Sequence, residues 1–168
     1  IKIAGDTFDE ATIAFLRKRY GLLVGQNTAE TVKMTIGCVS ERPEETSMLV
    51  KGRDLKTGLP KEQMISSSEL MEAYKRPARQ IVDEVLAVLE SSAPELVADI
   101  AQNGIVMTGG GSLLYGFDRL IEERTDITCS IADDADSCVA YGCGKSLQWI
   151  NSMQEGTINI ARRKLMKE

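Results

Sequence analysis

The sequence predicts a mixed α/β or α+β chain, and two patterns carry that prediction. Two runs of β-forming residues, at 47–53 and 63–66, are joined by a bend that contains Gly58 and Pro60. Further along, the short apolar run at 105–107 leads into three glycines and then into a helical pattern. Helical and strand patterns therefore alternate along the chain, and we find no internal repeat.

The first quarter of the chain carries two helical patterns. Alternation over 1–4 predicts the end of a strand, after which the chain turns. Apolar side chains then recur at helical spacing and predict a helix over 6–20. A second, shorter helix is expected over 28–36, with Thr28 as its N-cap. Residues 38–46 are expected to form a loop.

Capping signals predict the later helices. Ser66-x-x-Glu69 has the form of a capping box and predicts a long helix to about residue 91, which Pro77 should kink or break. A second such sequence, Ser92-x-x-Glu95, predicts the next helix. The remaining expected elements are strands at 105–107 and 127–131 and helices at 113–124 and 136–150.

Composition limits the chemistry that the chain can carry. Apolar residues make up 43% and charged residues 27%, a balance typical of soluble globular domains. The formal net charge of −5 disfavours a nucleic-acid partner. Because there is no histidine and the four cysteines form no Cys-x-x-Cys pair, we expect no metal site. The sequence starts at Ile1 rather than Met, so we expect that a preceding part has been removed.

The sharpest feature is the strand, triple-glycine and helix pattern at Gly109, Gly110 and Gly111. Glycines lack a Cβ atom and let the backbone come close to another group. A helix starting behind them would offer free N–H groups and a positive dipole end to an anion such as phosphate. A purely structural turn explains the pattern equally well. The dinucleotide-binding pattern G-x-G-x-x-G is excluded, because Leu114 stands at its third glycine.

Other candidate residues have simpler explanations. The Gly-Lys-Ser sequence at 144–146 resembles the end of a P-loop, but Val139 replaces the first glycine and the segment has a helical pattern, so we reject that interpretation. Glu30 and Lys33 lie on neighbouring turns of one helix face, and their spacing favours an exposed ion pair over contacts to a ribose or an adenine edge. Asp9 is explained as an acid near a helix N-terminus.

Seven short segments, in a fixed order, define a larger pattern between residues 1 and about 150. They are Ala4-Gly5-Asp6-x-Phe8-Asp9, the segments at 19–25 and 28–37, Val50-Lys51-Gly52-Arg53-Asp54-Leu55-x-x-Gly58-Leu59-Pro60, the segment at 94–100, Gly104-Ile105-Val106-Met107-Thr108-Gly109-Gly110-Gly111-Ser112-Leu113-Leu114, and the segment at 136–145. In this order and spacing they resemble the bacterial rod-shape family of MreB and Mbl proteins. No single segment is decisive, but their collinearity is highly specific.

The resemblance implies an actin-like ATPase fold of the ribonuclease H-like α/β kind, in which two lobes close over ATP. This chain would form the second lobe, with a core subdomain at 1–6 and 71–134 that is interrupted by a smaller α+β subdomain at 7–70. A helix at 135–155 would return toward a first lobe that the chain does not contain. Residues 156–168 would form a tail.

The resemblance also implies half of an ATP site. The residues that would contact the adenosine are Glu30, Thr31, Val32 and Lys33, and those that would border the nucleotide near the α-phosphate are Gly109, Gly110, Gly111, Ser112 and Leu113. The family's phosphate loops, its magnesium-binding aspartate and the carboxylate that positions the attacking water would all precede Ile1. We therefore expect no catalytic residue in this chain and no ATP hydrolysis by the chain alone.

The implied function of the full-length protein is that of an ATP-binding, filament-forming actin homologue that organises cell-wall synthesis and cell shape. Its implied partners are further protomers and the cell-wall elongation machinery, and its implied location is cytoplasmic, at the inner face of the membrane. The alternatives are a non-catalytic actin-fold interaction module and a relative of sugar kinases or chaperone ATPases.

Two parts of the chain depart from the family pattern. Ala4-Gly5 replaces the usual pair of glycines, and the segment 38–41 is divergent, which leaves the paralogue open. The tail at 156–168 lies beyond the resemblance. Its basic and apolar residues would suit a helix on acidic lipid or on a partner, but a frayed terminus explains it more simply.

Overall fold

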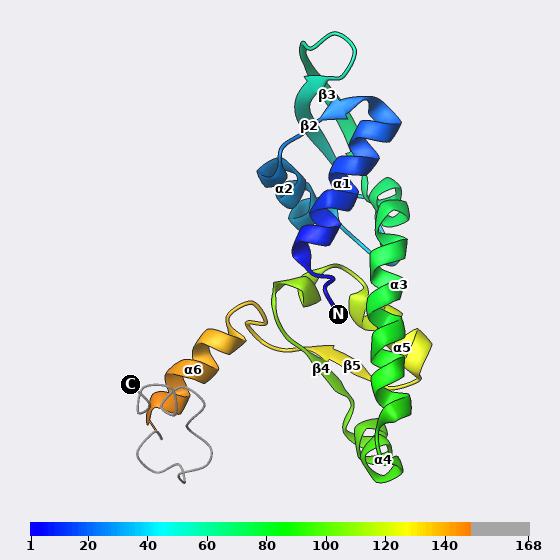
Figure 1. The fold of residues 1–168 in the computed structure, drawn as a ribbon, viewed down its shortest axis with the longest axis vertical. Helices are drawn as coiled ribbons and strands as arrows, with labels where there is room; N and C mark the ends of the chain where they lie inside the picture. The colour runs from blue at the N-terminus through cyan, green and yellow to red at the C-terminus, as the bar shows by residue number, and fades with distance from the viewer. Residues whose placement is uncertain (149–168) are drawn as a thin grey trace, which may run out of the picture.

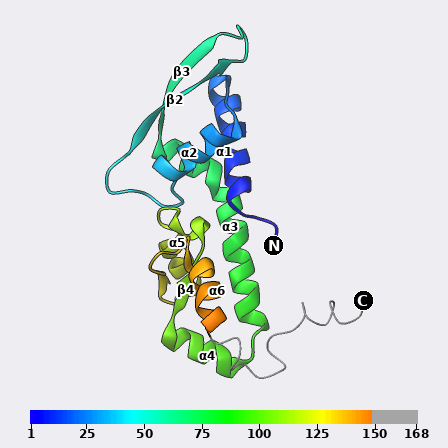
Figure 2. The ribbon, with the colours of Figure 1, turned by 90° about the vertical axis from the view of Figure 1, so that its left-hand side faces the viewer.

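The computed structural model describes residues 1–148, which form an elongated molecule of two regions joined by one long helix (Figures 1 and 2). The upper region comprises residues 5–66 and the first half of α3 (Ser67–Ser91), and the lower region comprises the second half of α3 and residues 92–148. A helix of this length spans about 37 Å, so α3 can contribute to the packing of both regions. Among residues 1–148, no helix combines the length and the apolar character needed to cross a membrane.

The upper region consists of two helices and a small antiparallel sheet. The helices are α1 (Gly5–Tyr20) and α2 (Gln26–Ile36), and the sheet has the order β1 (Leu22–Leu23), β2 (Ser47–Asp54) and β3 (Pro60–Ser66). The β2–β3 hairpin confirms the predicted pair of strands, with Ser47 opposite Ser66 and Arg53 opposite Pro60. Its turn contains Gly58 at φ +73°, a conformation that glycine adopts without strain.

The lower region is built around two parallel strands. The strands β4 (Ile105–Met107) and β5 (Cys129–Ile131) pair in parallel, with Ile105 beside Cys129. The connection between them runs through a short 3-10 helix, η1 (Gly110–Leu113), and through α5 (Phe117–Thr125). Two further helices, α4 (Pro94–Asn103) and α6 (Cys138–Gln148), lie at the periphery, and α6 stands away from the rest of the molecule (Figure 1).

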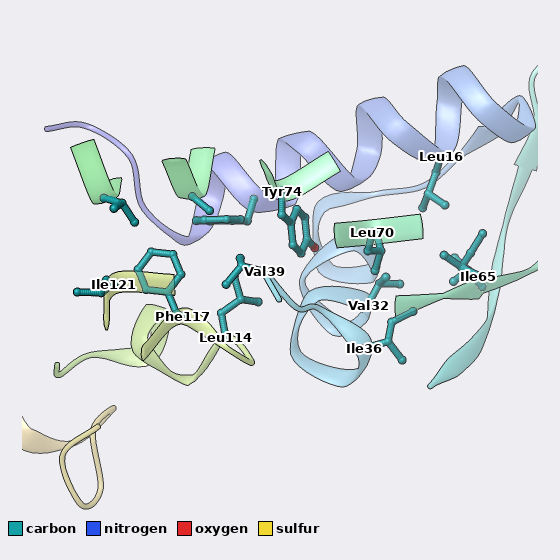
Figure 3. Close-up of a cluster of buried hydrophobic side chains, with 14 of the residues drawn as sticks. Leu16, Val32, Ile36, Val39, Ile65, Leu70, Tyr74, Leu114, Phe117 and Ile121 are labelled. Carbon is teal, nitrogen blue, oxygen red and sulfur yellow. The ribbon is translucent and has the colours of Figure 1, made fainter. Parts of the chain in front are cut away.

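A buried cluster of side chains joins the helices of the upper region and continues into α5 (Figure 3). Tyr74 on α3 lies at its centre, where its ring packs edge-on against Phe8 with 5.2 Å between the ring centroids. The hydroxyl group of Tyr74 forms a 2.6 Å hydrogen bond with Thr12 Oγ1, so both of these buried hydroxyl groups have a partner. Each fully buried aliphatic or aromatic side chain contributes about 1.5–3 kcal/mol through burial. The other central members are Leu16, Val32, Ile36, Ile65, Leu70, Leu114 and Phe117.

The capping box correctly predicted the start of α3, but the sequence did not predict that the helix continues through Pro77. The Ser66 N–H group donates to Glu69 Oε2 at 3.1 Å, which confirms the predicted capping box. The helix continues unbroken past Pro77, so the expectation of a break there is wrong. Pro77 is itself buried, as are Tyr74 and Ala78 of the same helix, and apolar burial opposes the cost of the backbone hydrogen bond that proline cannot make.

Several other predicted boundaries are also wrong. Residues 1–4 do not form a strand, because no strand among the described residues pairs with them. The helix α2 begins two residues earlier than expected, with Gly25 rather than Thr28 as its N-cap. The N-cap of α4 is Ala93, because Pro94 occupies the first turn, a position that suits its fixed φ.

The ends of two later elements also differ from the prediction. The strand expected over 127–131 is shorter, since β5 begins at Cys129, and the last helix begins at Cys138. The end of that expected helix, the 149–155 part of the returning helix and the tail at 156–168 lie outside the described residues.

Candidate functional site

The face of α2 that carries the predicted adenosine contacts is partly buried and partly open. Glu30 and Thr31 are exposed, whereas Val32 is fully buried in the core. The Thr31 hydroxyl donates to the carbonyl oxygen of Asn27 at 2.8 Å within the same helix. Of the four residues, only Glu30 and Lys33 carry a charged group that a ligand could contact. The buried side chain of Val32 packs this turn of α2 against the core.

Lys33 forms a contact that sequence reasoning missed. Its ammonium nitrogen lies 2.9 Å from Oδ1 of Asp9 on α1, and it also donates to the carbonyl oxygen of Gly5 at 3.3 Å. The Lys33 side chain is 16% exposed and the Asp9 side chain is 3% exposed. The expected exposed ion pair between Glu30 and Lys33 is therefore wrong, because Lys33 pairs with a buried carboxylate on a different helix.

A signal for the burial of Asp9 was present in the sequence. Asp9 lies three and seven residues before Thr12 and Leu16, the spacing that places side chains on one face of a helix. Both of those residues are buried, and Asp9 is buried with them. The interpretation of Asp9 as only an acid near the helix N-terminus overlooked this periodicity.

The glycine turn leads into a shorter helix than the sequence predicts. The expected helix directly behind the glycines is wrong: Gly110 and Gly111 themselves begin the four-residue 3-10 helix η1, and α5 begins only after Gly116 at φ +79°. The glycines therefore do not adjoin the start of an α-helix, and a helix dipole gives no support to anion binding there. The turn instead presents an exposed stretch of glycine backbone at Gly110 and Gly111.

The backbone conformation requires a glycine at only one of the three positions. Gly109 adopts φ +85°, where other residues are strained. Gly110 and Gly111 have no such requirement, and a Cβ atom built on either would meet no atom within 4 Å. Packing within the described residues thus does not explain these two glycines. Open space beside bare backbone is what a closely approaching ligand requires.

Ser112 and Leu113 complete the turn in different ways. Ser112 is buried, and its hydroxyl donates to the carbonyl oxygen of Gly109 at 2.7 Å, so it fixes the shape of the turn. The Gly109 N–H group donates to the carbonyl oxygen of Ala135 at 2.6 Å, which ties the turn to the segment after β5. Leu113 is exposed and offers an apolar side chain at the surface.

The structure brings the end of α2 next to the end of the glycine turn. Gly37 follows α2 directly, and Leu114 follows η1 directly. The two residues are so close that a Cβ atom built on Gly37 would lie 2.9 Å from the Leu114 side chain. The two segments then run side by side, and the Val39 N–H group donates to the carbonyl oxygen of Tyr115 at 2.9 Å. Figure 3 shows Val39 and Leu114 close together in this junction. The two halves of the predicted site are therefore fixed relative to each other.

Other features of the described residues lie outside this junction. Within residues 1–148, no group of three or more acidic or cysteine side chains has the geometry of a metal site. The Gly-Lys-Ser sequence at 144–146 lies inside α6 rather than in a loop after a strand. A groove of about 510 Å³ between α3 and α5 is lined by basic side chains such as Arg76 and Arg124 together with apolar ones such as Val82, and by none of the predicted site residues.

The buried cysteine thiols favour their protonated form. Burial raises the pKa of Cys38, although Arg42 opposes this shift, and burial likewise raises the pKa of Cys129. A thiol of raised pKa is a poor nucleophile at neutral pH. These two cysteines therefore act as small core residues.

Comparison with known proteins places this arrangement in a family. The family described as MreB/Mbl protein matches residues 1–155. The cell shape-determining protein MreB of Escherichia coli (strain K12) is 43% identical over 151 residues, which is 90% of this chain and 44% of that protein. The cell shape-determining protein Mbl of Bacillus subtilis (strain 168) is 37% identical over 147 residues, which is 88% of this chain and 44% of that protein. The chain thus spans less than half the length of these relatives.

Solved structures show the same fold. MreB5 of Spiroplasma citri bound to AMPPNP superposes with a TM-score of 0.86 at 38% identity, over 90% of this chain and 46% of that one. A MamK double helical filament superposes with a TM-score of 0.68 at 24% identity, over 82% of this chain and 43% of that one, and shows likeness of fold alone. These neighbours confirm the actin-like fold class expected from the sequence.

Proposed function

The chain belongs to the MreB/Mbl family of cell shape-determining proteins, and we propose that it is the C-terminal half of an ATP-binding member that assembles into filaments. Its curated relatives are more than twice as long as the segment that this chain matches. In the proposed full-length protein, residues 1–6 and 71–134 form the core of the second lobe and residues 7–70 form its smaller subdomain. The helix that begins at α6 leads back toward the first lobe.

We propose that the junction between α2 and η1 is one wall of the nucleotide cleft. The observation that carries this proposal is the open, Cβ-free backbone of Gly110 and Gly111, held at a fixed place beside the end of α2. Glu30 and Lys33 would bind the adenosine, with Thr31 and Val32 in the same turn. Gly109, Gly110, Gly111, Ser112 and Leu113 would pass close to the α-phosphate.

The rest of the ATP site would come from the first lobe. Residues upstream of Ile1 would hold the β- and γ-phosphates, the magnesium ion and the attacking water. Phosphoryl transfer depends on positioning and on charge stabilisation by such groups. The chain alone would therefore bind nucleotide weakly and would not turn it over, whereas the full-length protein would do both.

The assembly and the location of the protein belong to the same proposal. Its partners would be further copies of itself and the cell-wall elongation machinery, and it would act in the cytoplasm at the inner face of the membrane. The MamK neighbour is a double helical filament, and this supports self-association as a property that the fold permits.

Nucleotide binding by the full-length protein tests the site directly. We expect Glu30→Gln and Lys33→Met each to weaken binding of a fluorescent ATP analogue by roughly tenfold, since a hydrogen bond to a charged group contributes about 1.5–3 kcal/mol. The matched controls are Glu62→Gln and Lys51→Met, because Lys51 and Glu62 form an exposed 2.8 Å ion pair on the hairpin. Unchanged binding in both α2 variants would contradict the assignment of this wall.

Sedimentation with lipid vesicles tests the wider function. We expect the full-length protein to pellet with vesicles in the presence of ATP and to remain in the supernatant without nucleotide. Failure to bind nucleotide, together with failure to assemble, would favour the alternative of a non-catalytic interaction module with an actin-like fold.

A further inference from the structure

We propose that Asp9 is a positioning residue of the nucleotide site, which acts by holding Lys33. This inference rests on the proposed function, because the orientation of Lys33 matters to a ligand only if α2 faces one. Asp9 itself is 2% exposed, so its carboxylate acts on a nucleotide only through the lysine.

The first turns of α1 hold the Lys33 ammonium from two sides. The Asp9 carboxylate lies 2.9 Å from Nζ of Lys33, and the Gly5 carbonyl oxygen accepts from the same nitrogen at 3.3 Å. The contact with Gly5 is close, because a Cβ atom at that residue would lie 3.2 Å from Nζ. A larger residue at position 5 would press on the ammonium group. The position of Lys33 is therefore set by two groups of one rigid helix.

The Lys33 ammonium group keeps one donor for a ligand. A lysine ammonium group has three N–H donors and no acceptor. Within residues 1–148, the Gly5 carbonyl oxygen takes one of these donors and the ion pair with Asp9 engages at most one more, so at least one donor remains. The Lys33 side chain is 16% exposed, so it is not sealed from the surface. A ribose hydroxyl or a ring nitrogen of a base is an acceptor of the required kind, and Asp9 and Gly5 together decide the direction from which it must approach.

Stability alone does not account for the buried charge pair. Desolvation of two buried charges cancels much of their attraction, and an apolar pair of similar shape often serves as well. The helices α1 and α2 are already packed through apolar core residues such as Phe8, Val32 and Ile36. The helix dipole of α1 also does not require Asp9, because Asp6 lies in its first turn and is exposed.

Nucleotide selectivity separates positioning from a structural role. The full-length protein is compared as wild type, Asp9→Asn, Lys33→Met and the double variant, with ATP, 2′-deoxy-ATP and inosine triphosphate as ligands. The control is Asp54→Asn, which removes the carboxylate of another partly buried pair, the 3.1 Å contact with Lys61 in the hairpin. Circular dichroism establishes that each variant is folded before its dissociation constants are measured.

We expect Asp9→Asn to weaken ATP binding roughly 5- to 20-fold, which lies within the wider range of coupling measured between contacting residues. It should also reduce the preference for ATP over the analogue that lacks the group facing Lys33. In the Lys33→Met background, Asp9→Asn should cause no further loss. The Asp54→Asn variant should change neither the affinity nor the preference.

Three results would overturn the proposal, and they are distinguishable. If Lys33→Met weakens binding but Asp9→Asn does not, Asp9 has no positioning role and the proposed nucleotide site stands. If Asp9→Asn weakens all three nucleotides equally, with or without Lys33, its role is structural. If Lys33→Met leaves binding unchanged, the assignment of Lys33 to the site fails together with this inference. Should Asp9→Asn not fold, Asp9→Glu keeps the charge and moves the carboxylate by one methylene, and it should still alter the preference between nucleotides.

Discussion

The upper and lower regions differ in how completely their apolar side chains are covered. In the upper region Leu16, Val32, Leu70 and Tyr74 are fully buried. In the lower region neither α4 nor the described part of α6 buries any residue, and α6 carries the exposed apolar side chains of Val139, Tyr141 and Leu147. Val106 on the strand β4 is also 63% exposed. Both regions nevertheless contain elements of ordinary amphipathic character.

This difference shows that an amphipathic pattern predicts an apolar face but not its partner. The helices α1, α2 and α3 find their partners within residues 1–148, and their buried faces supply central members of the core. The faces of β4, α4 and α6 are left open within that range, and a large open apolar surface is typical of an interface. The open face of α6 supports the proposal that this helix leads toward the first lobe in the full-length protein.

The largest expected effect comes from a side chain in the covered region. Leu70→Ala should lower the free energy of unfolding of the chain by about 2–5 kcal/mol, since it leaves a cavity in a closely packed core. Leu96→Ala, at a site 57% exposed on α4, should change it by less than about 0.5 kcal/mol. Urea denaturation measures both. Similar losses of unfolding free energy at the two sites would show that the contrast between the regions is wrong. If Leu96→Ala costs more unfolding free energy in the full-length protein than in this chain, α4 is covered there.

An intermediate effect is expected at the glycine turn of the lower region. Gly109→Ala should cost about 1–2 kcal/mol of stability, because alanine is strained at φ +85°. Gly110→Ala should leave the stability almost unchanged, since a Cβ atom there meets nothing, but it should weaken nucleotide binding by the full-length protein. Thermal unfolding and nucleotide titration separate the two effects. Undiminished nucleotide affinity in Gly110→Ala would place the ligand away from this backbone.

The smallest effect is expected at the hairpin turn of the upper region, where exposure is high but polar contacts are many. Hydrogen bonds from the Thr57 N–H group, the Lys61 side chain and the Lys56 N–H group hold the pKa of Asp54 well below its usual range. A carboxyl group with a depressed folded-state pKa stabilises the fold fully above its unfolded pKa of about 3.9 and loses this contribution as the pH falls toward the folded value. Hairpin amide protection should therefore decline below about pH 4 in the wild type.

The variant Asp54→Asn provides the control for this pH dependence. Its amide cannot titrate, so the hairpin should show a lower but flatter protection between about pH 5 and pH 2. Hydrogen exchange followed by NMR would measure the profile for both proteins. Parallel profiles would show that another group is responsible for the loss at low pH.

Much of the fold and part of the candidate site could be predicted from the sequence. The hairpin, the capping box at Ser66 and Glu69, and the order of helices and strands depend on residues close together in the chain, so local patterns reveal them. The glycine turn was recognisable for the same reason. The correct N-cap of α2 was missed because Gly25 carries no side-chain signal, unlike Thr28.

The sequence by itself determined the mixed α/β class, the family, and the glycine backbone at 109–111, because periodicity, turn chemistry and collinear motifs are contained in the order of residues. Only the tertiary structure decided that α3 passes unbroken through Pro77, that the last two of the three glycines begin a 3-10 helix, and that Lys33 pairs with Asp9 rather than with Glu30. These outcomes depend on packing between helices that are distant in the chain, and burial at such contacts overrides local preference. The contact between Gly37, at the end of α2, and Leu114, at the end of the glycine turn, likewise forms only in the folded chain.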